Sequence, residues 1–132
     1  MMANDTNSFR TPIGRARGLG SAKTGAQAWL GFRIAAAALA VLTILFIILV
    51  ISLVGAPYEQ VVATFKQPCP VILTVLFLGF LFHHAAYGMQ EVYEDYIHGK
   101  LAKLFAIGAT KLVALALFLA GAFAVLKIAF GA

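Results

Sequence analysis

The residues that could do chemistry in this 132-residue sequence gather in one stretch, between His83 and His98. Two adjacent histidines, His83 and His84, come near the end of a long apolar run, and acidic and aromatic side chains follow them. An ionisable side chain within a membrane is costly and marks a functional site by default. A neutral imidazole is also a common axial ligand of haem iron. The stretch therefore indicates a ligand or cofactor site near the end of an apolar segment.

The helical repeat separates the two histidines. At about 100° per residue, one stripe of a helix carries four residues of the stretch: His84, Gly88, Glu91 and Asp95. Gly88 removes a side chain one turn after His84, where a flat macrocycle could lie, whereas His83 faces about 100° away. Six-coordinate haem needs a second axial ligand, and the other apolar segments contain no histidine. The chain therefore shares a haem with a partner or binds none, in which case His84 is a hydrogen-bonded packing residue.

Asp95 and Tyr96 close the stretch at the predicted membrane edge. A carboxylate beside a phenol at this depth can hydrogen-bond and protonate a polar, lipid-soluble head group. Interfacial tyrosines with acids at a helix end are also a common feature of membrane proteins. Taken alone, these two residues favour the interfacial interpretation.

The composition excludes a soluble protein. Hydrophobic residues make up 62% of the chain and charged residues 11%, and the mean hydropathy is +0.94. A soluble domain is typically about 45–50% apolar and about 25% charged. The net charge of +5 comes from basic residues that flank apolar runs, so it does not indicate a nucleic-acid partner. A single cysteine excludes an internal disulfide.

The elements that position the site are three apolar segments. Residues 1–28 form a polar, basic N-terminal segment, and residues 29–132 form a membrane unit. Each apolar segment reaches the roughly 20 residues that a span needs, which predicts helices over about 31–54, 70–94 and 103–128. Backbone groups have no water partners in lipid, so the spans must be helical. The sequence predicts an all-α membrane protein with three transmembrane helices, whose frequent small residues favour packing within a larger assembly.

The basic residues predict the orientation of these spans. They are concentrated before or at the start of the first span and in the second connection: Arg10, Arg15, Arg17, Lys23 and Arg33, then Lys100 and Lys103. The first connection and the C-terminal end carry one lysine each, Lys66 and Lys127. The positive-inside rule therefore predicts a cytoplasmic N-terminus and a periplasmic C-terminus.

The spacing of the stretch adds a resemblance. From His84 to Tyr96 the chain reads His-Ala-x-x-Gly-x-x-x-Val-x-x-Asp-Tyr. This pattern resembles the small hydrophobic membrane anchor family of succinate dehydrogenase (complex II). Upstream, the run Gly-Ser-Ala-Lys-Thr-Gly at residues 20–25 and Arg33 are also similar to that family. The resemblance covers about residues 18–132.

The resemblance implies a role for four residues. It makes His84 an axial ligand of the iron of a b-type haem, and it places Arg33 beside the haem propionates and the quinone pocket. It assigns Asp95 and Tyr96 to the ubiquinone site, where the tyrosine donates a hydrogen bond to a quinone carbonyl. Twelve residues of helix, about 18 Å, separate His84 from Tyr96, which suits a haem deep in the membrane and a quinone near its inner surface. His83 and His98 lie outside the motif.

The resemblance also implies partners. These are a second, cytochrome b556-type anchor that shares the haem, an iron–sulfur subunit, a flavoprotein that oxidises succinate, and membrane lipid. The chain would then serve the tricarboxylic acid cycle and the respiratory chain from the inner membrane of a bacterium, with no dehydrogenase chemistry of its own. The alternatives are a haem-free anchor, as in some fumarate reductases, and a small helical assembly or channel protein without a redox role. A haem absorption band distinguishes them.

Overall fold

The computed structural model describes residues 11, 13 and 25–131 of the chain. Residues 25–131 form four helices: α2 (Gly25–Leu53), α3 (Tyr58–Phe65), α4 (Pro68–Tyr96) and α5 (Lys100–Phe130). The predicted polar segment, residues 1–28, lies mostly outside the described residues, and so do its basic residues Arg10, Arg15, Arg17 and Lys23.

Three of these helices are long and apolar enough to cross a membrane, over Trp29–Leu53, Pro68–Tyr96 and Lys100–Phe130. The predicted all-helical fold with three candidate transmembrane helices is therefore confirmed. Large apolar side chains such as Ile44, Leu112 and Phe123 are exposed along them, as expected of helices whose solvent is hydrocarbon. The orientation across the membrane stays a prediction from the charge distribution.

Glycine and proline set the ends of the helices. After α2, Gly55 turns the chain with a φ of 78°, a conformation that glycine adopts at little cost. Pro68 lies in the first turn of α4, where the absent N–H removes no hydrogen bond. At the end of α5, Gly131 takes a left-handed conformation with a φ of 70°, a common helix stop. The short helix α3 lies in the first connection, where the sequence predicted only a loop.

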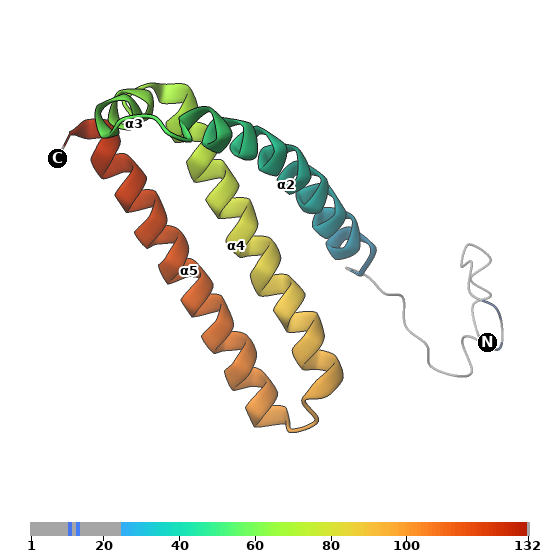
Figure 1. The fold of residues 1–132 in the computed structure, drawn as a ribbon. Helices are drawn as coiled ribbons and strands as arrows, with labels where there is room; N and C mark the ends of the chain where they lie inside the picture. Colours follow the sequence, from blue (N-terminus) through green and yellow to red (C-terminus); the bar gives the residue numbers. More distant parts are fainter. Residues whose placement is uncertain (1–10, 12, 14–24, 132) are drawn as a thin grey trace, which may run out of the picture.

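α4 is the central helix, with α5 along one side and α2 inclined across the other (Figure 1). The rings of Phe46 and Phe77 stack between α2 and α4 with centroids 4.3 Å apart. Between α4 and α5, a Cβ added at Gly79 would lie 3.4 Å from the Phe118 ring, so glycine allows this close approach. The hydroxyls of Tyr93 and Thr110 also hydrogen-bond across this interface at 3.1 Å.

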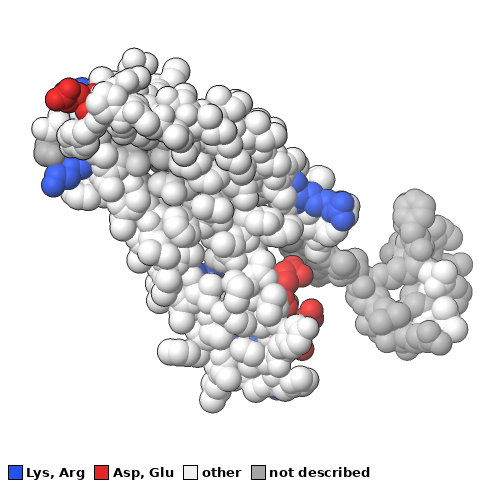
Figure 2. Space-filling view, viewed as in Figure 1, with Lys and Arg blue, Asp and Glu red and all other residues white. Residues whose placement is uncertain are grey.

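The helices have two distinct ends. The start of α2 and the α4–α5 connection lie toward one end, called here the Tyr96 end, while α3 and the end of α5 form the opposite, Lys127 end (Figure 1). Charged side chains gather toward these ends and leave the middle of the visible surface almost uncharged (Figure 2).

Few side chains are buried between the helices. Among the described residues only Val71, Thr74, Ala86 and Ala122 are buried. The buried hydroxyl of Thr74 donates to the Pro70 carbonyl one turn earlier, at 2.8 Å. Helices in lipid gain little by burying apolar faces against one another. Most of the surface is therefore available to lipid or to other membrane subunits.

Candidate haem and quinone site

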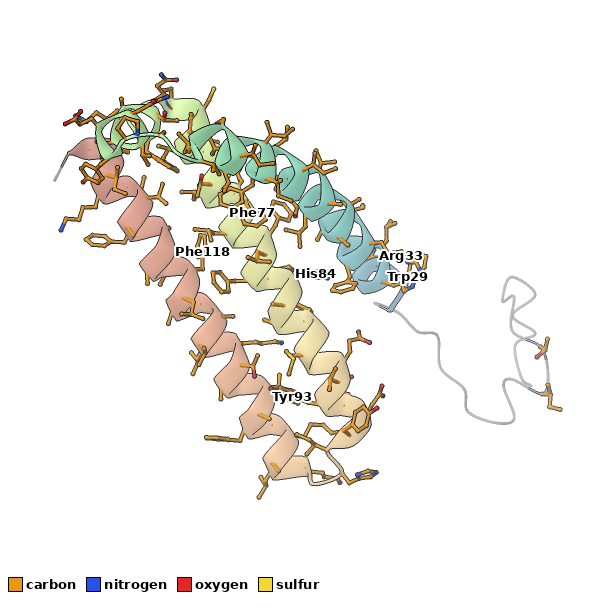
Figure 3. All side chains as sticks on the ribbon, viewed as in Figure 1. Trp29, Arg33, Phe77, His84, Tyr93 and Phe118 are labelled. Atoms are coloured by element: carbon orange, nitrogen blue, oxygen red, sulfur yellow. The ribbon has the colours of Figure 1, made fainter. Side chains whose placement is uncertain are left out.

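His84 lies on the side of α4 that faces α2 (Figure 3). Its imidazole stacks on the Phe32 ring of α2, with centroids 5.0 Å apart and planes inclined by 14°. The His84 Nδ1 atom is buried and has no hydrogen-bond partner in the part of the chain that the structure describes. Buried polar atoms without a partner are rare and costly. The imidazole is thus stacked against α2 with one nitrogen enclosed and unpaired among the described residues, which is unusual for a histidine that only packs.

The backbone beside His84 is open at Gly88. A Cβ added there would meet nothing within 4 Å, so a flat group can approach the helix one turn from the imidazole. No cluster of three or more His, Cys, Asp or Glu residues suited to a metal ion occurs in the described part of the chain. An imidazole with open backbone next to it fits one side of a haem, and the described residues offer no second histidine on the other helices.

Arg33 follows Phe32 directly and points away from α4 at the Tyr96 end of α2 (Figure 3). Its guanidinium carbon lies 4.1 Å from the centroid of the Trp29 ring, a cation–π contact. No carboxylate of residues 25–131 forms an ion pair with it. A planar guanidinium of this kind suits a carboxylate, to which it can donate two parallel hydrogen bonds.

Asp95 and Tyr96 form the last residues of α4, and both are exposed. The Tyr96 side chain is 79% exposed. Its hydroxyl makes no hydrogen bond with the described residues. The structure places His84 against Phe32, the residue before Arg33. It does not place Asp95 or Tyr96 in a pocket with His84 or with Arg33. Within this chain, the four predicted residues form two separate surfaces.

A cavity of about 580 Å³ lies between α2 and α4, near the stacked rings of Phe32 and His84. Its lining includes Trp29, Phe32, His83, Tyr87, Gln90 and Glu91, together with two glycines of α2. The Gln90 amide nitrogen donates to the Glu94 carboxylate at 2.7 Å, while the Gln90 amide oxygen is buried without a partner. None of the four predicted site residues lines this cavity.

Phe32 and Trp29 are site residues that the sequence reasoning missed. Trp29 lies four residues before Arg33, a spacing that places two side chains on one helix face. The contact between them could therefore have been predicted from the sequence. The stacking of Phe32 on His84 could not be predicted from the sequence, because it depends on how α2 crosses α4.

These features define a class of protein: a small membrane protein with three helices long and apolar enough to cross the bilayer, along which large apolar side chains are exposed. Residues 7–125 match the family described as succinate dehydrogenase/fumarate reductase transmembrane subunit.

Two curated relatives agree with this match. The chain is 37% identical over 102 residues to the succinate dehydrogenase hydrophobic membrane anchor subunit of Paracoccus denitrificans, covering 75% of this chain and 79% of the relative. It is 32% identical over 92 residues to the protein of the same name from Rickettsia bellii (strain RML369-C), covering 70% and 74%. No solved structure matches the chain. The chain belongs to the succinate dehydrogenase/fumarate reductase transmembrane subunit family, and the predicted identity as a succinate dehydrogenase membrane anchor is confirmed.

Proposed function

We propose that this chain provides one side of a haem b site and part of the quinone-reducing site of succinate:quinone oxidoreductase. The observation that carries the proposal is the His84 imidazole, which is stacked on Phe32 with its Nδ1 atom buried and unpaired. A packing histidine would be expected to satisfy that atom within the chain.

His84 would hold the haem iron from this chain, and a cytochrome b556-type partner anchor would hold the other side of the haem. Haem, when bound, takes up and releases one electron at a time. Phe32 holds the plane of the imidazole, and Gly88 leaves the adjacent backbone open. Arg33 would pair with a haem propionate through its guanidinium, which forms no ion pair with a carboxylate of residues 25–131.

Asp95 and Tyr96 would bind the quinone at the Tyr96 end. A quinone carbonyl only accepts hydrogen bonds, and it gains negative charge as it is reduced, so the phenol donor binds the reduced ring more strongly than the oxidised one. Asp95 would orient that phenol or pass protons to the ring. Both side chains are exposed in this chain, which suits a quinone pocket whose remaining walls belong to other subunits.

The Tyr96 end would face the cytoplasm of a bacterium, with the C-terminus in the periplasm. Lys100 and Lys103 lie at this end, in agreement with the positive-inside rule. An iron–sulfur subunit and a flavoprotein would dock there and deliver electrons from succinate to ubiquinone. The chain would anchor and position these groups and have no dehydrogenase activity of its own.

Co-purification tests this function. An affinity tag on this chain should recover flavin, iron–sulfur and haem signals in fixed proportion from solubilised membranes. Recovery of flavin and iron–sulfur without haem would support the haem-free anchor instead. Recovery of none of the three would contradict the proposed redox role.

A further inference from the structure

Two side-chain hydrogen bonds from α5 reach the turn of α4 that ends at Tyr96. The ammonium of Lys103 donates to the backbone carbonyl of Glu94 at 3.0 Å. The hydroxyls of Tyr93 and Thr110 hydrogen-bond at 3.1 Å. The two residues of α4 that take part lie directly before the predicted quinone pair, so this pair continues a stretch of helix that is attached to α5.

The end of α4 has carbonyl groups that need partners. The last four carbonyls of a helix have none within it, and α4 has no basic residue of its own in the last turn. The amide of Ile97 donates to the carbonyl of Tyr93 at 3.0 Å, and Lys103 serves the next carbonyl, that of Glu94. A cation here is also favoured by the negative end of the helix dipole. Lys103 therefore caps α4 from the neighbouring helix.

Lys103 gains no such benefit within its own helix. α5 begins at Lys100 and has no acidic residue in its first turn, and the dipole disfavours cations at a helix N-terminus. Lys100 and Lys103 both carry this cost, and both count toward the orientation by the positive-inside rule. Lys103, however, is partly buried and reaches α4, whereas Lys100 is exposed and donates no side-chain hydrogen bond within the described part of the chain. The contact with α4 thus distinguishes Lys103 from a lysine that only sets orientation.

The cap bears on Tyr96 because little else holds this residue. Its side chain is 79% exposed, so its place is set by the backbone of the last turn. Helix ends fray, and a frayed turn would carry Asp95 and Tyr96 with it. The Glu94 carbonyl that Lys103 holds lies two residues before Tyr96. This step rests on the proposed function, in which the Tyr96 phenol donates to a quinone carbonyl.

We propose that Lys103 is a positioning residue for quinone binding. It does not touch the quinone. By capping the last turn of α4, it keeps the Tyr96 phenol ordered before the quinone arrives, and the Tyr93–Thr110 bond supports the same turn from α5. A donor that is already ordered loses less conformational freedom on binding, and the affinity rises accordingly.

The dependence of turnover on quinone concentration tests this role. Succinate–quinone reductase activity of the purified complex is measured with a short-chain ubiquinone, and succinate oxidation with a soluble artificial acceptor is measured on the same preparation. We expect Lys103→Met to raise the KM for the quinone about two- to fivefold, the effect of one cation at an exposed helix C-terminus. The kcat, the soluble-acceptor activity and the haem spectrum should change little.

The matched control is Lys100→Met, which removes the same charge from the same turn of α5 and should keep the native KM. Lys103→Arg keeps a charged donor and should restore most of the quinone affinity. Hydrogen exchange of the backbone amides in the last turn of α4 should rise in Lys103→Met and not in Lys100→Met. If Lys103→Met fails to assemble, Tyr93→Phe removes the bond to Thr110 and should raise the KM in the same direction.

A double variant separates this inference from the proposed function. In a Tyr96→Phe complex the donor is already absent, so adding Lys103→Met should cause no further loss of kcat/KM. A further loss as large as that in the native background would show that Lys103 acts elsewhere, for example on the docking of a partner subunit. A native KM and native hydrogen exchange in Lys103→Met, with Tyr96→Phe impaired, would overturn the positioning role alone. Native activity in Tyr96→Phe would contradict the quinone role of Tyr96 and this inference with it.

Discussion

Phe32 covers one face of the His84 imidazole, with the two rings nearly parallel and their centroids 5.0 Å apart. Phe32 is also the residue before Arg33, so a single turn of α2 holds the candidate haem ligand and presents the candidate propionate partner. The proposed site therefore depends on the way α2 packs across α4 and not on α4 alone.

Replacing Phe32 should disturb the haem through His84. In Phe32→Leu the imidazole loses its flat neighbour and can rotate, so the low-spin haem signal in electron paramagnetic resonance should shift or broaden. Phe46→Leu is the control, because Phe46 stacks on Phe77 in the same interface at 4.3 Å without touching His84. An identical signal in native and Phe32→Leu complexes would show that Phe32 does not position the ligand.

Filling the space beside Gly88 should exclude the haem. A Cβ added at Gly88 meets nothing within 4 Å, and replacing a helical glycine raises helix propensity, so Gly88→Leu should not harm the helix itself. We expect reduced haem content per mole of complex. Gly108→Leu, at another open helical glycine on α5, should keep its haem. A Gly88→Leu complex with full haem content would place the haem elsewhere.

Arg33→Leu should lower haem retention or quinone turnover while leaving membrane insertion unchanged. Four other basic residues precede the first span in the sequence, enough to fix the orientation by the positive-inside rule. Cysteine accessibility on the two sides of the membrane measures the orientation. Inverted topology, or full quinone turnover with a normal haem content, would argue against a site role for Arg33.

Tyr96→Phe should reduce succinate–quinone reductase activity sharply. Losing one donor in a water-poor site costs about 2.7–4 kcal/mol in comparable cases, or roughly 10²–10³ in turnover. Succinate oxidation with a soluble artificial acceptor should persist in the same preparation, because that reaction bypasses the membrane site. Equal loss of both activities would indicate failed assembly, and loss of neither would make Tyr96 an interfacial residue.

The sequence predicted the parts of this protein that depend on local pattern. Long apolar runs predicted three membrane helices, because helix length is set by bilayer thickness. The motif from His84 to Tyr96 predicted the family that the comparisons confirm. The four-residue spacing of Trp29 and Arg33 was also readable in principle.

Contacts between helices were not readable from one sequence. The stack of Phe32 on His84 joins residues 52 positions apart, and the approach of Lys111 to Tyr87 joins α5 to α4. Both depend on the rotation and crossing of helices, which packing between small residues decides. Under the proposed function the remaining walls of the quinone site at Tyr96 belong to other subunits, which one sequence and one chain do not contain.

The adjacent histidines allow the most direct measurement of the central claim. His84→Ala and His83→Ala change neighbouring positions on one helix, and only His84 stacks on Phe32. The measurement is the reduced-minus-oxidised absorption spectrum of each purified complex, normalised to flavin. The account predicts that His84→Ala loses the native haem b band and that His83→Ala keeps it. A native band in His84→Ala, with the band lost in His83→Ala, would contradict the assignment of His84 as the haem ligand.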